Sequence, residues 1–131
     1  MKKLSYVASI IMASLFLMSS VSVKDEKAKP KIHRIVCFKF KAGTTAEAKL
    51  KHMNEFAAFV KQVPLVLSYR AGKTVKGEQK TDPDFDVMHY LTFEKEQDIL
   101  TYDAHPAHKK FVDANKASWE NVLAINGAIE K

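Results

Sequence analysis

The sequence contains a single cysteine, Cys37, among its 131 residues, so no disulfide can form within the chain. It also lacks zinc-finger spacing of Cys and His, a basic stripe interleaved with aromatic residues, and an RNA-binding aromatic motif. These absences exclude a disulfide-stapled scaffold and argue against a nucleic-acid-binding protein. Cys37 itself is predicted to be a small core residue rather than a reactive thiol.

Charged residues are absent from residues 4–23, an apolar run with small residues at its end that follows two lysines. This pattern predicts a signal peptide, residues 1–22, cleaved near Ser22, with export to the periplasm or outside the cell. Residues 23–31 have the composition of a solvated linker. The run is also long enough to cross a bilayer, so an uncleaved anchor is the alternative, and we expect membrane attachment only in that case.

The rest of the chain has the composition of one globular domain, since the whole sequence is 47% apolar and only 27% charged. Apolar spacing predicts six elements, with a capping box at Thr44 and Glu47 opening a helix that ends before Pro64. The predicted order is strand, helix, strand, strand, helix, strand, over residues 32–41, 42–63, 65–75, 85–94, 96–122 and 123–130.

This order is the split βαβ pattern of a ferredoxin-like α+β fold, βαββαβ, in which a four-stranded antiparallel sheet carries both helices on one face. The predicted domain spans residues 32–130. Period two divides its first strand into two apolar faces. One carries His33, Ile35 and Cys37, and the other carries Val36, Phe38 and Phe40. We expect the first face to lie under the helices and the second to pack on another copy, which predicts a homodimer.

The stretch TYDAHPAHKKF, residues 101–111, holds the side chains best suited to chemistry. Pro106 suits the first position of a helix, with His105 just outside it. His108 then lies in the first turn, where the helix dipole favours the neutral imidazole that a general base requires. A phenol beside it could donate to a carbonyl oxygen while the imidazole takes a proton. The stretch therefore offers Tyr102 and His108 as a candidate acid/base pair, although periodicity across Pro106 does not decide whether they meet. His33 is a third member if its face points at the helices.

Two other interpretations of this stretch stay open. In one, it only starts a helix and its side chains are structural. In the other, His105 and His108 bind a metal together with His33. Because the helix begins between the first two, and no carboxylate stands at ligand spacing, we expect no metal. The remaining histidines, His52 on the exposed side of the first helix and His89 in mid-strand, are predicted to be structural.

The segments HRIVCFKFKAG, VPLVLSYRAGK, DVMHYLTFE, YDAHPAHKKFV and WENVLAING give the chain a resemblance to a known family. Over residues 31–130 it resembles the stress-responsive A/B barrel (Dabb) family of dimeric α/β-barrel proteins. A polyketide cyclase branch of this family works without metal or cofactor. The resemblance therefore implies a cofactor-free acid/base role for Tyr102 and His108, with His33 lining the cavity.

Three functions are compatible with these observations. The first is binding of a small, largely apolar molecule in a pocket between sheet and helices, contacted by His33, Ile35, Cys37 and His105. The second is a cofactor-free enzyme acting on a carbonyl compound. The third is a structural or interaction protein whose dimer surface is its function.

Overall fold

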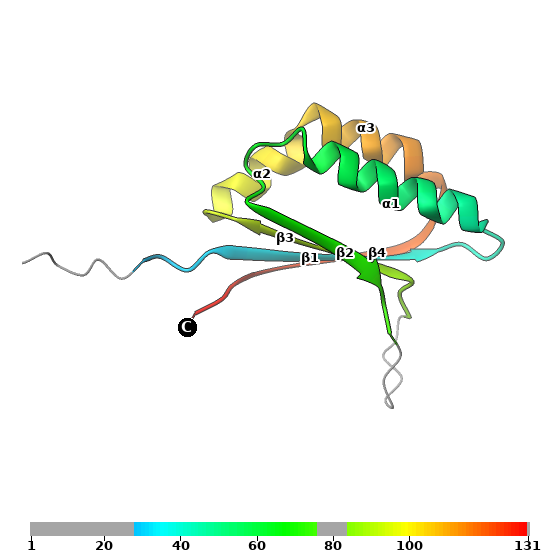
Figure 1. Cartoon of the computed structure of the whole chain (residues 1–131), viewed down its shortest axis with the longest axis horizontal. Helices are drawn as coiled ribbons and strands as arrows, with labels where there is room; N and C mark the ends of the chain where they lie inside the picture. The colour runs from blue at the N-terminus through cyan, green and yellow to red at the C-terminus, as the bar shows by residue number, and fades with distance from the viewer. Residues whose placement is uncertain (1–27, 76–83, 131) are drawn as a thin grey trace, which may run out of the picture.

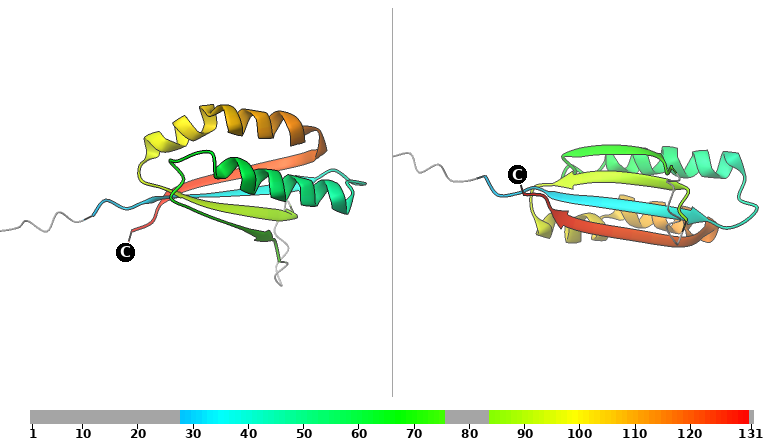
Figure 2. Two further views of the ribbon diagram at one scale, coloured as in Figure 1. Left: turned by 45° about the horizontal axis from the view of Figure 1, so that its top comes forward. Right: turned by 90° about the horizontal axis from the view of Figure 1, so that it is seen from below.

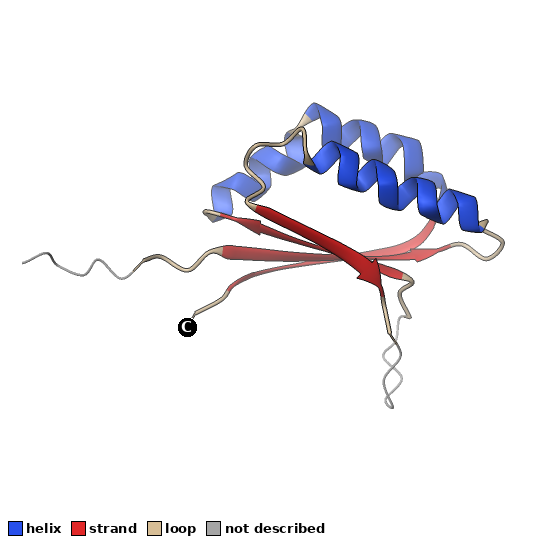
Figure 3. Cartoon of the chain, viewed as in Figure 1, coloured by secondary structure: helices blue, strands red, loops and turns tan. Residues whose placement is uncertain are grey.

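The computed structural model describes residues 28–75 and 84–130, which form a four-stranded sheet with helices on one face (Figures 1 and 3). The strand order is β2-β3-β1-β4, and neighbouring strands are antiparallel. The predicted ferredoxin-like fold is confirmed. The elements are β1 (Ile32–Phe40), α1 (Ala46–Val60), β2 (Ser68–Lys73), β3 (Val87–Phe93), α2 (Glu96–Ala104), α3 (Pro106–Asn115), the short 3₁₀ helix η1 (Lys116–Ser118) and β4 (Trp119–Ala128).

The first helix begins one residue later than its sequence signal predicts. Gly43 turns the chain with φ +83°, and the Thr44 hydroxyl donates to the Lys41 carbonyl inside this turn. Thr45 is the N-cap, and its side chain accepts from the Ala48 N–H at 3.1 Å. The predicted capping box of Thr44 and Glu47 is therefore wrong, and a neighbouring threonine caps the helix instead.

The second helical region ends earlier than predicted. Its last four residues, 119–122, were expected to be helical but belong to β4. In this register Trp119 lies opposite Phe40, and Val122 lies opposite Phe38. Pairing along the whole length of β1 gives the backbone N–H and C=O groups of this segment hydrogen-bond partners. The stabilisation from this pairing outweighs the local helical pattern.

The two faces of β1 are the reverse of the sequence prediction. Val36, Phe38 and Phe40 are buried in the core with side chains of α1 and α3. His33, Ile35 and Cys37 alternate with them, so they lie on the opposite face, which no helix covers in the described part of the chain (Figure 2). We name the uncovered side of the sheet the open face.

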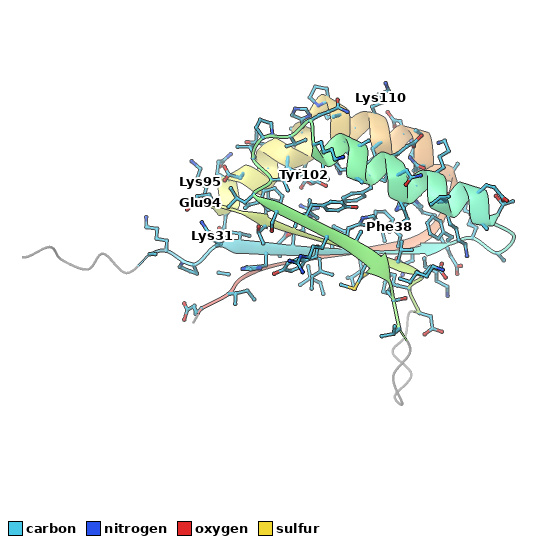
Figure 4. The ribbon with its side chains drawn as sticks, in the orientation of Figure 1. Lys31, Phe38, Glu94, Lys95, Tyr102 and Lys110 are labelled. Carbon is cyan, nitrogen blue, oxygen red and sulfur yellow. The ribbon has the colours of Figure 1, made fainter. Side chains whose placement is uncertain are left out.

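The core between sheet and helices is filled mainly by aromatic rings. Figure 4 shows Phe38 and Tyr102 pointing into this layer from the sheet and from the helices. His52 also lies there with 0% of its surface exposed, so the prediction that it faces solvent is wrong. The rings that pack together are Phe38, Phe40, Phe56, Phe59, Phe93, Tyr102, Phe111 and Trp119.

The predicted signal peptide and most of the linker, residues 1–27, lie outside the described residues. Among the helices that the structure describes, none combines the length and the apolar character needed to span a bilayer.

Candidate functional site

Tyr102 and His108 are neighbours, although they belong to different helices, which settles a point that the spacing across Pro106 left open. Their ring centroids are 4.9 Å apart, with Tyr102 near the end of α2 and His108 in the first turn of α3. The phenol is 1% exposed, whereas the imidazole is partly exposed. The chain therefore presents a buried phenol beside an imidazole that solvent can reach.

The break between α2 and α3 fixes which nitrogen of His108 carries the proton. His105 is the N-cap of α3, and its Nδ1 accepts from the Ala107 N–H at 3.1 Å. Because α2 ends at Ala104, the Asp103 carbonyl has no partner within that helix, and Nδ1 of His108 lies 3.0 Å from it. A carbonyl can only accept, so Nδ1 donates and Nε2 of neutral His108 keeps a free lone pair. A general base requires a free lone pair of this kind to accept a proton.

Tyr102 is held in its protonated form. Burial raises the pKa of the phenol, and the nearby Arg34 guanidinium opposes this only in part. The hydroxyl thus remains a hydrogen-bond donor at neutral pH. A donor phenol and an acceptor imidazole in contact are complementary acid and base groups.

Arg34 is a site residue that the sequence analysis missed. Its guanidinium carbon lies 5.5 Å from the Tyr102 ring centroid, and its Nη1 lies 3.1 Å from Oδ1 of Asp103. The side chain is only 11% exposed, and its buried Nε has no hydrogen-bond partner. The sequence signal that could have identified Arg34 is its spacing of two residues from Val36. This spacing places both side chains under the helices once the faces of β1 are assigned correctly.

The strand residues predicted to line the pocket do not lie on the side of the sheet that carries Tyr102 and His108. The His33 imidazole is hydrogen-bonded to the Tyr90 hydroxyl on the open face, which is the side of the sheet away from Tyr102. Ile35 and Cys37 share that face, and partial burial raises the pKa of the Cys37 thiol. Both faces of β1 are apolar, so alternation alone could not tell which one the helices cover.

His105 has a structural role, since its ring caps α3 by accepting from the Ala107 N–H. His105 does not share the open face with His33, Ile35 and Cys37, and its contact with a ligand stays a prediction. In residues 28–75 and 84–130, no group of three or more His, Cys, Asp or Glu side chains is arranged to hold a metal ion.

A second constellation links four elements through the core. Trp119 Nε1 lies 3.2 Å from His52 Nδ1, His52 Nε2 lies 3.2 Å from His89 Nε2, and His89 Nδ1 lies 2.9 Å from the Tyr69 hydroxyl. Both imidazoles are 0% exposed. Burial lowers the pKa of His52 to about 4 and that of His89 to about 3, so both are neutral. We name these four residues the core relay.

Two surface pockets border the helices. One, of about 400 Å³, lies between α2 and the neighbouring ends of β1 and β4, with Ile32, Ile99 and Asn126 among its lining. The other, of about 240 Å³, is a groove between α1 and α3 with Phe59 and Phe111 in its wall.

Phe59 separates the groove from the acid/base pair. Its ring centroid lies 5.8 Å from that of Tyr102 and 5.6 Å from that of His108. Tyr102 and His108 therefore lie directly behind one wall of the groove.

Comparison with known proteins adds the following. A family model described as the stress responsive A/B barrel domain matches residues 32–127. Olivetolic acid cyclase of Cannabis sativa is 27% identical over 95 residues, which cover 72% of this chain and 93% of that protein. The stress-response A/B barrel domain-containing protein HS1 of Arabidopsis thaliana is 27% identical over 101 residues, covering 77% of this chain and 92% of the relative.

Solved structures share the fold. A hydroxynitrile lyase from Passiflora edulis superposes with a TM-score of 0.70 at 16% identity, over 79% of this chain and 96% of the lyase. A dimeric ferredoxin-like protein of unknown function from Bacteroides fragilis gives a TM-score of 0.61 at 19% identity, over 76% of this chain and 96% of that one. At these identities the likeness establishes the fold alone.

Proposed function

The chain belongs to the stress-responsive A/B barrel domain family, and from that premise we propose that it is a cofactor-independent enzyme acting on a small carbonyl compound. Tyr102 is the acid and His108 is the base. The single observation that carries this proposal is the contact of a protonated phenol with an imidazole whose Nε2 lone pair is free. Residues that only start a helix have no need of this arrangement.

The chemistry follows from the two protonation states. His108 Nε2 takes a proton from the carbon next to the carbonyl group, while the Tyr102 hydroxyl donates a hydrogen bond to the carbonyl oxygen. The electron pair of the C–H bond then moves toward the oxygen, and the charge that develops there is held by the phenol. The enol or enolate can return the proton at the same carbon or react with a second group.

The relatives support a catalytic role for this fold. Olivetolic acid cyclase and the Passiflora hydroxynitrile lyase carry names of enzymes with organic substrates. Such a substrate would be small, because the groove holds about 240 Å³, and it would have an apolar part, because Phe59 contacts both rings of the pair. It would enter through the groove between α1 and α3, with Phe59 turning aside.

We propose further that the protein is a homodimer formed through the open face. Ile125 is 54% exposed and Leu123 is 40% exposed, and both lie on β4 opposite residues of β1 that share this face. Ile35 and Tyr90 extend the same apolar area across β1 and β3. Related structures are described as dimeric, which supports this assignment. The tyrosine and histidine pair remains within one protomer.

Export also remains a proposal, supported by the apolar N-terminal run after two lysines. The mass of the mature protein from its own host tests it. A polypeptide that starts near residue 23 is expected, and a full-length product found in the cytoplasm would sink the idea.

Exchange of the protons next to the carbonyl group of acetophenone for deuterium, followed by ¹H NMR in D₂O, tests the catalytic proposal. Binding of olivetolic acid, the compound in the name of one relative, is followed by calorimetry. His108→Ala and Tyr102→Phe are expected to lose turnover by at least about a hundredfold while keeping the fold. His105→Asn is the matched control, since asparagine preserves the cap but removes the other imidazole. Unchanged rates in both site variants would refute the assignment.

A further inference from the structure

The direction of hydrogen bonding in the core relay is forced by its first member. The Trp119 indole can only donate, so His52 Nδ1 must accept. The proton of neutral His52 is therefore on Nε2, and it is donated to His89 Nε2. His89 then carries its own proton on Nδ1 and donates it to the Tyr69 oxygen. Each bond in the chain points the same way.

This direction leaves the Tyr69 hydroxyl proton free to serve another acceptor. The Tyr69 oxygen receives a hydrogen bond from His89, so its own O–H must point elsewhere. Bonds in such a chain polarise one another, which strengthens the last donor in the series. The core relay thus orients and polarises the Tyr69 hydroxyl, which is its last member.

Aromatic stacking holds that end in place. The rings of Tyr69 and His89 are nearly parallel, with 12° between their planes. Phe56 lies flat against both, at 3.7 Å from His89 and 5.6 Å from Tyr69 between centroids, with 11° between planes in each case. The imidazole and the phenol cannot turn independently of this ring, so the hydrogen-bond geometry is preorganised.

The sheet register places Tyr69 on the face of the sheet that carries the candidate site. Tyr69 on β2 lies opposite Leu91 on β3, which lies opposite Arg34 on β1. Residues that are paired in this way share a face, so all three point toward the helices. Arg34 lies against the Tyr102 ring, and a charge on Tyr69 would further raise the pKa of Tyr102. Tyr69 and Arg34 therefore flank Leu91 on the face that the helices cover, and the Tyr102 ring lies against Arg34.

We propose that Tyr69 is a second phenol donor of the site, contacting an oxygen of the carbonyl compound other than the one bound by Tyr102. Trp119, His52 and His89 are positioning residues, which act on the substrate only through the Tyr69 hydroxyl. The inference rests on the proposed function, because it needs a ligand beside Tyr102. It defines the substrate as a compound with two oxygen acceptors.

The first test is spectroscopic and needs no ligand. Long-range ¹H–¹⁵N correlation of the histidine rings at neutral pH reports which nitrogen carries each proton. We expect His52 protonated on Nε2 and His89 protonated on Nδ1. Trp119→Phe removes the donor to His52 and is expected to produce a mixture of tautomers in both rings. The opposite tautomers in the wild-type protein overturn the relay, and they do so even if Trp119→Phe does not fold.

The second test uses olivetolic acid, which carries several oxygen acceptors, as the probe. Tyr69→Phe is expected to weaken its binding about tenfold, as the loss of one hydrogen bond predicts. Tyr90→Phe is the matched control, because Tyr90 also bonds a histidine but lies on the open face. Binding that is weakened by Tyr102→Phe but unchanged in Tyr69→Phe overturns this proposal alone. Absence of binding to the wild-type protein removes the proposed function and the role of Tyr69 with it.

Discussion

The Arg34 guanidinium lies over the Tyr102 ring, with 5.5 Å from its central carbon to the ring centroid, while the same group is paired with Asp103 on α2. A buried cation on the central strand β1 is thereby neutralised by the helix that carries the phenol. The pair ties α2 to the sheet at the site itself. It also places a positive charge where it favours an electron-rich ring or oxygen.

Arg34→Leu is expected to lower the free energy of unfolding by about 2 kcal/mol, because Asp103 loses its charged partner in a half-buried position. Urea unfolding of both proteins measures the difference. Lys31→Ala breaks an exposed pair with Glu94 and serves as the control, with a change of about 0.5 kcal/mol or less. Equal effects of the two substitutions would contradict the structural role of Arg34.

Stability should fall as pH drops below 6.5. The pKa of His52 is lowered to about 4 and that of His89 to about 3. Between pH 6.5 and these values both imidazoles stay neutral in the folded chain, whereas they take up a proton in the unfolded chain. Each histidine then costs about 1.4 kcal/mol per pH unit between its unfolded and folded pKa values. Between pH 7.5 and 5.0 we expect a loss of about 4 kcal/mol from the pair, measured by urea unfolding at both values.

The double variant His52→Leu and His89→Leu is the control for this pH dependence. Both proteins keep their carboxylates, so any common acid sensitivity cancels in the comparison. The variant should lose most of the difference between pH 7.5 and pH 5.0. A variant as acid-sensitive as the wild-type protein would show that the buried imidazoles are not the cause.

Local signals were sufficient for the order of elements and for the place of His108, but not for its contact with Tyr102 across the break at Pro106. Pro106 can only begin a helix, so the start of α3 and the place of His108 in its first turn follow from one residue. The capping role of His105 has the same origin. Such features depend on a few neighbouring residues, which a sequence displays directly.

Which side chains pack in the core could not be predicted in the same way. Both faces of β1 are apolar, so alternation alone could not decide that Phe38 faces the helices and Ile35 does not. In α1 the buried stripe includes His52 and Phe56, while Leu50 is 61% exposed. The polar atoms of His52 gain partners only from other elements, Trp119 and His89, which no pattern within the helix reveals.

Ile125→Lys should convert the dimer to a monomer at micromolar concentration. A lysine in the middle of the open face must be desolvated without a partner, which a stable interface does not tolerate. Leu50→Lys is the matched control, because Leu50 is similarly exposed but lies on α1. Size-exclusion chromatography with light scattering gives the mass of each protein. A wild-type monomer, or an Ile125→Lys dimer, would rule out this interface.

The cap at the start of α3 can be tested separately from catalysis. His105→Ala removes the acceptor for the Ala107 N–H and is expected to lower stability by about 1 kcal/mol. For a domain of this size that corresponds to a fall of roughly 4–8 °C in the midpoint of thermal unfolding. His105→Asn supplies an amide oxygen in place of the imidazole nitrogen and should stay within about 2 °C of the wild-type protein. Equal destabilisation by alanine and asparagine would mean that the ring is needed for more than capping.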